Sequence, residues 1–256
     1  MLRKILLLIA FSPFVIFSQL GGKASFQFLN ISDNARVMGV GGYNVSSSDD
    51  DHNMLVENPG ALDTAHGGSI TVNYLPYFTT INKTSLLYSF NGKKSGAWSV
   101  GTTYNSYGEF DGKDPSGNDI DDFRASDYQL FVTKSFKVNN FQMGLTTSLV
   151  GSQIANFSSN AITFDLGGVF KHPEHDFQIG MVIKNAGFIF NRFIPGTEQS
   201  LPVDLRIGAS YKLEHMPLRV SLTVVNLLIK DVYYFNPDLN TSFDPNGNEV
   251  IDDPKF

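Results

Sequence analysis

This sequence lacks cysteine, an excess of basic charge and an apolar helix of membrane length in the body of the chain. None of the 256 residues is cysteine, which excludes a disulfide framework, a thiolate nucleophile and a cysteine-linked lipid anchor. Its 19 lysines and arginines are outnumbered by 25 acidic residues, so the basic patch of a nucleic-acid binder is not expected. The mean hydropathy of −0.08 is too low for a helical membrane protein. It allows a membrane β-barrel, in which half of each strand faces a polar lumen.

Residues 1–18 are predicted to be a signal peptide. They combine a basic start, MLRK, with the apolar run ILLLIAFSPFVIF and a cleavage site after Ser18. The run is short for a membrane span and is interrupted by Pro13; an uncleaved N-terminal anchor is the alternative. We therefore expect the mature chain to begin at Gln19 in an exported compartment.

Short segments with period-two alternation dominate the rest of the chain. Val203 and Ile207 alternate with Asp204 and Arg206, which is the pattern of a strand with one apolar and one polar face. Lys134 interrupts one such apolar row. Strands are expected in SITVNYLP, SLLYSF, AWSVGTTYN, DYQLFVTKSFK, FQMGLTTSLV, ITFDLGGVFK, FQIGMVIKN, VDLRIGASYK and LRVSLTVVN. The sequence thus predicts nine strands, each paired antiparallel with its neighbour.

The connections between these strands are expected to alternate between short turns and long loops. Short turns are predicted at NGKKSG, VNN, HPEHD and LEHMP. Long loops are predicted at Tyr77 to Lys83, Ser106 to Ser126, Gly151 to Asn160 and Ala186 to Pro202. Such sorting is typical of outer-membrane β-barrels, whose periplasmic turns are short and whose external loops are long.

The chemistry of the two faces favours a membrane barrel over a soluble sheet. Both explain alternation, but the barrel better explains rows of Gly, Ser, Thr, Asp and Lys on one side and aromatic girdles at the two membrane interfaces. The expected girdle residues are Tyr74, Tyr104, Tyr128, Phe141, Phe170, Phe177 and Tyr211. The predicted fold class is an all-β, antiparallel transmembrane β-barrel in the cell outer membrane, with its apolar rows in contact with lipid.

Loop sorting also predicts an orientation and a division of the chain. With the short turns in the periplasm, residues 19–68 start on the periplasmic side and are expected to lie in the lumen or across its mouth. Residues 69–256 are assigned to the barrel. Nine strands leave the chain outside the cell after Asn226, whereas bacterial barrels use even numbers. The stretch from Phe235 to Phe256 is expected to be a turn-rich loop without a closing strand, because Pro254 has no amide donor. We therefore expect a C-terminally incomplete barrel.

No set of residues in the sequence predicts catalysis. HPEH brings His172, Glu174 and His175 together, and a solvated turn explains it better than a metal site. No Ser/His/Asp set has a supporting motif, and G-x-S-x-G does not occur. We therefore predict no catalytic, cofactor-binding or metal-binding residue and do not expect an enzyme.

Acidic stretches are the remaining candidates for a binding role. Asp114 to Asp122 and Asp244 to Asp253 offer oxygens at alternate positions, but neither has the Gly and Glu spacing of an EF-hand. Turn chemistry explains both, and Ser46 to Asp51 is predicted to be a solvated bend. Ser106 to Ser126 carries six acidic residues against Lys113 and Arg124. Long loops often carry function, so this one is expected to contact a partner.

An ordered set of short motifs runs through the mature chain. FQFLN is followed by AR, by GVGG (Gly39, Gly41, Gly42), by an acidic patch and by ENPGAL, and later by YNSYGEFDG, FDLGGVF, MVIKNAG and LPVDLRIGASYKLEHMPLRVSLTVVNL. Taken together, these motifs resemble the PorQ family, outer-membrane components of the Bacteroidetes type IX secretion system. That family usually shows NPA where this chain has NPG.

The resemblance implies a barrel similar to FadL and PorV, with about fourteen strands and an N-terminal segment in the lumen. It also implies a non-enzymatic scaffold that holds a PorZ-like surface protein in an attachment complex with PorU-like and PorV-like components. No partner-binding residue can be assigned from it. A FadL-like channel for small hydrophobic molecules and a secreted β-sandwich adhesin are the alternative functions.

Overall fold

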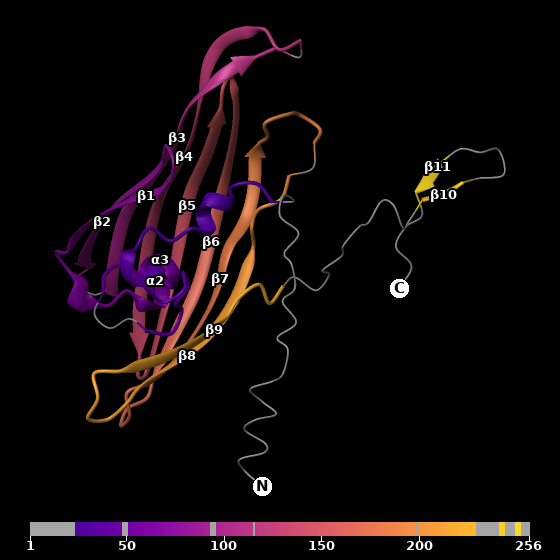
Figure 1. Cartoon of the computed structure of the whole chain (residues 1–256). Helices are drawn as coiled ribbons and strands as arrows, with labels where there is room; N and C mark the ends of the chain where they lie inside the picture. The colour runs from indigo at the N-terminus through magenta and orange to yellow at the C-terminus, as the bar shows by residue number, and fades with distance from the viewer. Residues whose placement is uncertain are drawn as a thin grey trace. The chain divides into compact units, whose positions relative to one another are not determined.

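The computed structural model describes residues 24–47, 51–92, 96–114, 116–197, 199–228, 241–243 and 249–251. The chain separates into two units, one of residues 24–228 and one containing both chain ends. The predicted signal peptide and most of the stretch Asp244 to Asp253 lie outside the described residues. The first unit is built on a single antiparallel sheet (Figure 1).

Nine strands follow one another in this sheet in the order of the sequence. They are β1 (Ile70–Phe78), β2 (Ile81–Gly92), β3 (Gly96–Lys113), β4 (Asp119–Val138), β5 (Phe141–Ile154), β6 (Phe157–Lys171), β7 (Phe177–Asn191), β8 (Asp204–Lys212) and β9 (Arg219–Val224). Each strand pairs antiparallel with the next, from Ile70 opposite Tyr88 to Ile207 opposite Val224. The prediction of nine antiparallel strands is confirmed.

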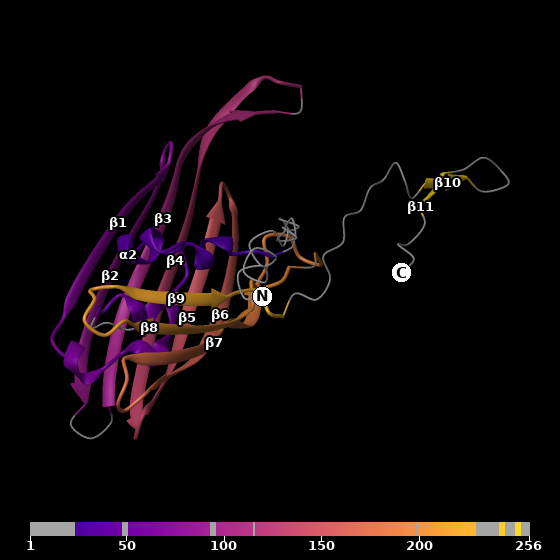
Figure 2. The same cartoon turned by 60° about the horizontal axis from the view of Figure 1, so that its bottom comes forward.

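The sheet is open in the part of the chain that the structure describes. Its two edges are β1 and β9, which do not pair with each other. Strand twist makes a sheet of this width curl, and Figure 2 shows it curving around the helix α2 (Ala35–Gly39). The all-β antiparallel class is thus confirmed, whereas closure into a barrel is not seen in these residues.

The long loops predicted from the sequence are mostly strand. β3 and β4 continue as a paired hairpin through Ser106 to Ser126, with Glu109 opposite Arg124 and Lys113 opposite Asp119. Two-residue turns join β1 to β2 and β5 to β6. Of the four predicted long loops, the one between β7 and β8 remains a long connection. The loop prediction is therefore wrong at three of four positions. Backbone pairing needs no apolar alternation, so polar strand extensions gave no periodic signal.

The second unit corrects the prediction for the C-terminal stretch. β10 (Thr241–Phe243) and β11 (Glu249–Ile251) pair antiparallel, with Thr241 opposite Ile251. A turn-rich loop alone was expected there, whereas the described residues form two short paired strands.

Residues 24–68 are the N-terminal segment, and its described parts, 24–47 and 51–68, pack on the polar face of the sheet. The segment contains η1 (Gln27–Asn30), α2, α3 (Met54–Glu57), η2 (Pro59–Ala61) and η3 (Thr64–His66). Side chains cap these short turns: Asn34 Oδ1 accepts from the Val37 amide at 2.9 Å, and Asp63 and His66 form a capping box. No helix among the described residues has the length and apolar character needed to cross a membrane.

The N-terminal segment runs along the strands from one end of the sheet toward the other. Ala24 forms a parallel bridge with Ser200 in the β7–β8 connection, whereas Gly68 donates to the Ser89 carbonyl beside the start of β1 at 2.7 Å. The sequence predicted that this segment starts on the side of the short turns. Among the described residues that is wrong, because Ala24 lies toward the opposite rim; Gln19 itself is outside them.

Candidate functional site

The apolar face of the sheet is exposed. Alternate side chains on the strands project from it, and Val72 and Leu222 are 66% and 71% exposed. The face includes Leu86, Tyr88, Val100, Leu130, Val132, Met143, Leu145, Leu149, Phe164, Leu166, Ile179, Met181, Ile183, Ile207 and Val220. A β-sandwich requires such rows to be buried between two sheets. The sandwich alternative is therefore wrong for the described residues.

Aromatic residues form a row across the apolar face. Tyr74, Tyr104 and Tyr128 are exposed and lie at the same level of β1, β3 and β4. Lys134, which interrupted an apolar row in the sequence, lies over the ring of Trp98 with its Nζ 5.0 Å from the centroid. A cation above an aromatic face is favourable, which explains how this row tolerates the lysine.

The polar face is buried instead. The N-terminal segment covers inward-pointing residues that include Ser85, Ser89, Ser99, Thr103, Asn105, Asp127, Thr133, Ser135, Gln142, Thr146, Ser148, Thr163, Asp165, Gln178, Lys184, Asp204, Arg206 and Ser210. A soluble sheet shows the reverse arrangement, with its apolar side covered and its polar side wet. The interface between the polar face and the N-terminal segment is the candidate functional site.

Two buried lysines of the sheet hold the backbone of the N-terminal segment. Lys83 Nζ donates to the carbonyl of Phe28 at 3.2 Å and also to that of Ile31. Lys184 Nζ donates to the Val56 carbonyl at 2.7 Å. Irregular backbone has no neighbouring strand to accept from, and an unpaired buried carbonyl is costly. The lysines therefore supply donors to carbonyls of the segment, although the Phe28 carbonyl also accepts from the Ile31 amide at 3.2 Å.

Arg206 is a buried cation with several partners in the site. It is 1% exposed, and it donates to Glu57 Oε2 at 3.1 Å and to Asn30 Oδ1 at 3.2 Å. Its Nε pairs with Asp204 at 2.5 Å, and its guanidinium carbon lies 4.7 Å from the centroid of the Tyr43 ring. A buried charge is tolerated only when it is paired and hydrogen-bonded. Arg206 thus ties three separate parts of the N-terminal segment to β8.

Asn58 anchors the NPG turn of the segment to β6 and β7. Its Nδ2 lies 2.7 Å from the Val45 carbonyl and 3.2 Å from the Gly168 carbonyl. Its Oδ1 accepts from the Gly60 amide at 2.9 Å, which fixes the turn. The carbonyl of Leu62, after this turn, accepts from Ser135 at 2.5 Å and from Gln142.

Glycines on the polar face make room for this turn and for the chain before it. A Cβ at Gly144 would lie 2.3 Å from the Pro59 carbonyl oxygen, and one at Gly180 would lie 1.9 Å from that of Val45. Both are backbone atoms, and close backbone approach is a common reason for glycine within a strand. The sheet therefore contains a seat shaped for the N-terminal segment.

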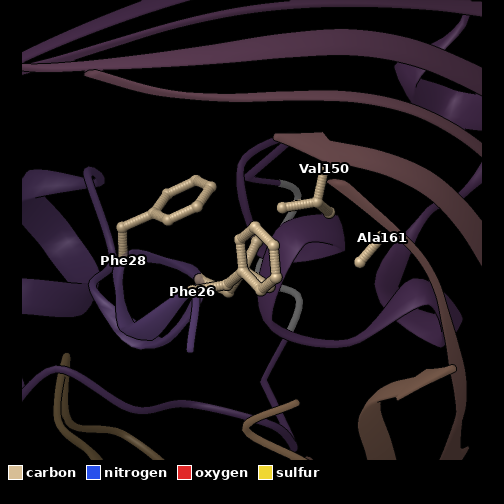
Figure 3. Close-up of a cluster of buried hydrophobic side chains, with 5 residues drawn as sticks. Phe26, Phe28, Val150 and Ala161 are labelled. Atoms are coloured by element: carbon tan, nitrogen blue, oxygen red, sulfur yellow. The ribbon is translucent and has the colours of Figure 1, made fainter. Parts of the chain in front are cut away.

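A small apolar cluster fixes the start of the segment. Phe26, Phe28 and Leu29 pack with Val150 and Ala161 of the sheet, and Figure 3 shows Phe26 beside Val150. At Asn185 the strand β7 bulges with φ of 58°, and its amide donates to Asp165 at 2.6 Å. These contacts leave a cavity of about 20 Å³ near Leu29 and Lys184, which is room for about one water molecule.

Two buried histidines lie where the segment meets β1 and β2. The rings of His52 and His66 are 5.7 Å apart. His52 Nδ1 lies 2.8 Å from Thr71 Oγ1, and its Nε2 contacts Ser89 Oγ. Burial lowers the pKa of His52; nearby His66 lowers it further, and Asp51 opposes the shift. The neutral imidazole is therefore favoured in the folded protein.

The stretches considered as metal sites form hydrogen-bonded turns where they are described. His172 Nδ1 accepts from the amides of Glu174 and His175 at 3.2 and 3.1 Å. Asp114 Oδ1 accepts from the amides of Ser116 and Asn118, both at 2.8 Å, and the Asn118 side chain holds the pKa of Asp114 below its usual value. Among the described residues no three or more His, Asp or Glu side chains are grouped as metal ligands.

The residues that join the segment to the sheet were not predicted from the sequence. Lys184 and Arg206 occupy inward positions of predicted strands, where a long charged side chain needs a buried partner, whereas Lys83 lay at the end of a predicted loop. That requirement was a usable signal. Their partners were not predictable, because Glu57 and Arg206 are 149 residues apart and no pattern links them.

Comparisons with known proteins identify no family for this chain. A scan against protein-family models found no matching model, and a search of curated proteins found no match.

Proposed function

We propose that this sheet is part of the wall of an outer-membrane β-barrel whose lumen is plugged by the N-terminal segment. The observation that carries the proposal is the inversion of the faces: the polar side is buried and the apolar side is exposed. An apolar surface of this extent is an aggregation hazard in water, but lipid solvates it. Closure would require further strands that pair with the free edges of β1 and β9. Lipid cannot hydrogen-bond to the unpaired backbone groups of an open edge.

We propose further that the protein is a non-enzymatic anchor rather than a channel. A channel of the FadL type needs a path or an apolar pocket behind its plug. Here Arg206, Lys83 and Lys184 tie the N-terminal segment to three strands. These ties favour a fixed plug, which suits a scaffold.

The proposed setting is the type IX secretion attachment complex, and the support for it is the resemblance of the ordered motifs to the PorQ family. The β3–β4 hairpin is the proposed contact for a PorZ-like surface protein. It extends past the paired parts of β2 and β5, exposes Phe110 and Ile120, and carries the acidic residues noted above. PorU-like and PorV-like proteins complete the complex.

Copurification from detergent-solubilised outer membrane, with the full-length protein, tests this function. The anchor requires recovery of PorZ-like and PorV-like proteins. Reversing two hairpin charges with D111K and D121K should reduce recovery of the PorZ-like protein. The matched variant E174K with E214K, on the opposite rim, should not.

Other outcomes would overturn the proposal. A barrel that purifies alone and admits a labelled fatty acid into the membrane would favour the channel. A protein that is recovered from the periplasm without detergent would contradict the membrane location itself.

A further inference from the structure

The N-terminal segment contacts the sheet near both rims. The Phe28 carbonyl meets Lys83, the third residue of β2, beside the β1–β2 turn. The Leu62 carbonyl meets Gln142, the second residue of β5, beside the β4–β5 turn. These two turns lie at opposite rims of an antiparallel sheet. The segment therefore crosses the polar face from rim to rim.

The length of this path can be estimated on one strand. Along β2, the Phe28 contact at Lys83 and the Gly68 contact at Ser89 are six residues apart, which is about 20 Å at 3.3 Å per residue. Ala24 lies beyond Phe28 and is joined to the β7–β8 connection, where the Ser25 amide donates to the Ser200 carbonyl at 2.8 Å. Ala24 therefore belongs to the rim that carries the β3–β4 hairpin.

We infer that Ala24 lies at the external rim of the protein, on the same side as the β3–β4 hairpin. The assignment of that rim to the outside rests on the proposed function. The sharing of a rim by Ala24 and the hairpin does not, because it follows from strand direction alone.

Because the chain has no cysteine, single cysteines give unambiguous labels. The variant A24C reports whether the start of the segment can be reached by a reagent. S116C does the same for the exposed tip of the β3–β4 hairpin, and E174C for the exposed β6–β7 turn. Each full-length variant is treated with a membrane-impermeant maleimide in intact cells, and again after the outer membrane is permeabilised. We expect A24C and S116C to react in intact cells at rates within about tenfold, and E174C to react only after permeabilisation.

The outcomes separate the inference from the proposed function. If A24C is labelled under the same conditions as E174C and not as S116C, the inference is overturned, whichever rim faces outward. If A24C and S116C are labelled alike but only after permeabilisation, Ala24 and the hairpin still share a rim, and the proposed orientation in the membrane fails.

If all three variants react alike, the membrane placement fails, and a second measurement decides the shared rim. In the purified protein, A24C with S200C should form a disulfide under mild oxidant, since bridged residues lie within disulfide range. The pair A24C with E174C should not. Absence of the first disulfide, or formation of the second, would overturn the inference.

Discussion

Gly180→Ala is the sharpest test of the seat in which the N-terminal segment lies. The new Cβ would lie 1.9 Å from the Val45 carbonyl oxygen, 2.5 Å from the Val45 carbonyl carbon and 2.8 Å from the Ser46 Cα. These are backbone atoms that no side-chain rotation can move. An ordinary contact needs about 3.4 Å, so the segment or the strand must shift by roughly 1.5 Å.

The cost of this shift can be bounded. Forcing one extra carbon into a packed site typically costs about 1–3 kcal/mol. That energy corresponds to about a 5- to 150-fold increase in the population with the segment displaced. The contact of Asn58 with the Val45 carbonyl, at 2.7 Å, should be the first to break. The sheet itself should remain, because the substitution adds no polar group and removes no strand pairing.

Amide hydrogen exchange of the detergent-solubilised protein measures that population directly. We expect faster exchange at residues 44–58 in Gly180→Ala, with unchanged exchange in β4 and β5. The matched control is Gly168→Ala, whose Cβ would have its nearest neighbours at 3.6 and 4.0 Å, an ordinary contact. Equal exchange in the two variants would refute the idea that glycines shape the seat.

Three further predictions follow from the site and the apolar face. Replacing Glu57 by Ala should remove one of the two buried carboxylates that pair with Arg206 and destabilise the attached segment by up to about 3–5 kcal/mol. Rapid proteolysis of the segment would report this loss. Proteolysis as slow as in the wild-type protein would contradict a structural role for the pair. Burial lowers the pKa of His52 from its ordinary 6.5, so the unfolded chain binds more protons than the folded protein, and stability should fall as the pH drops below about 6.5. Amide exchange rates measured over a pH series check this. The variant H52Q should remove that part of the pH dependence. Leu145→Arg should destabilise the membrane-inserted protein by about 2–4 kcal/mol if the apolar face contacts lipid, and the yield of assembled protein measures this loss. Ile120→Arg on the hairpin is the control and should change the yield little. Because both side chains are exposed, equal yields would argue against lipid contact.

Alternation in the sequence was sufficient to predict the strands because the period of two is a local property. Leu205, Ile207 and their neighbours show which side of β8 is apolar without any knowledge of the other strands. The same signal failed at Ser106 to Ser126, where β3 and β4 pair beyond the region in which one face is uniformly apolar. Pairing there is held by backbone hydrogen bonds, which leave no trace in side-chain periodicity.

The sequence by itself determined that the chain forms antiparallel strands with one apolar and one polar face, because each residue's side follows from its position in the alternation. Only the tertiary structure decided what covers the polar face. The contacts of Glu57 with Arg206, of Phe28 with Lys83 and of Val45 with Gly180 join residues that are far apart in the chain. Such contacts depend on the path of an irregular segment across nine strands, and a period of two carries no information about that path.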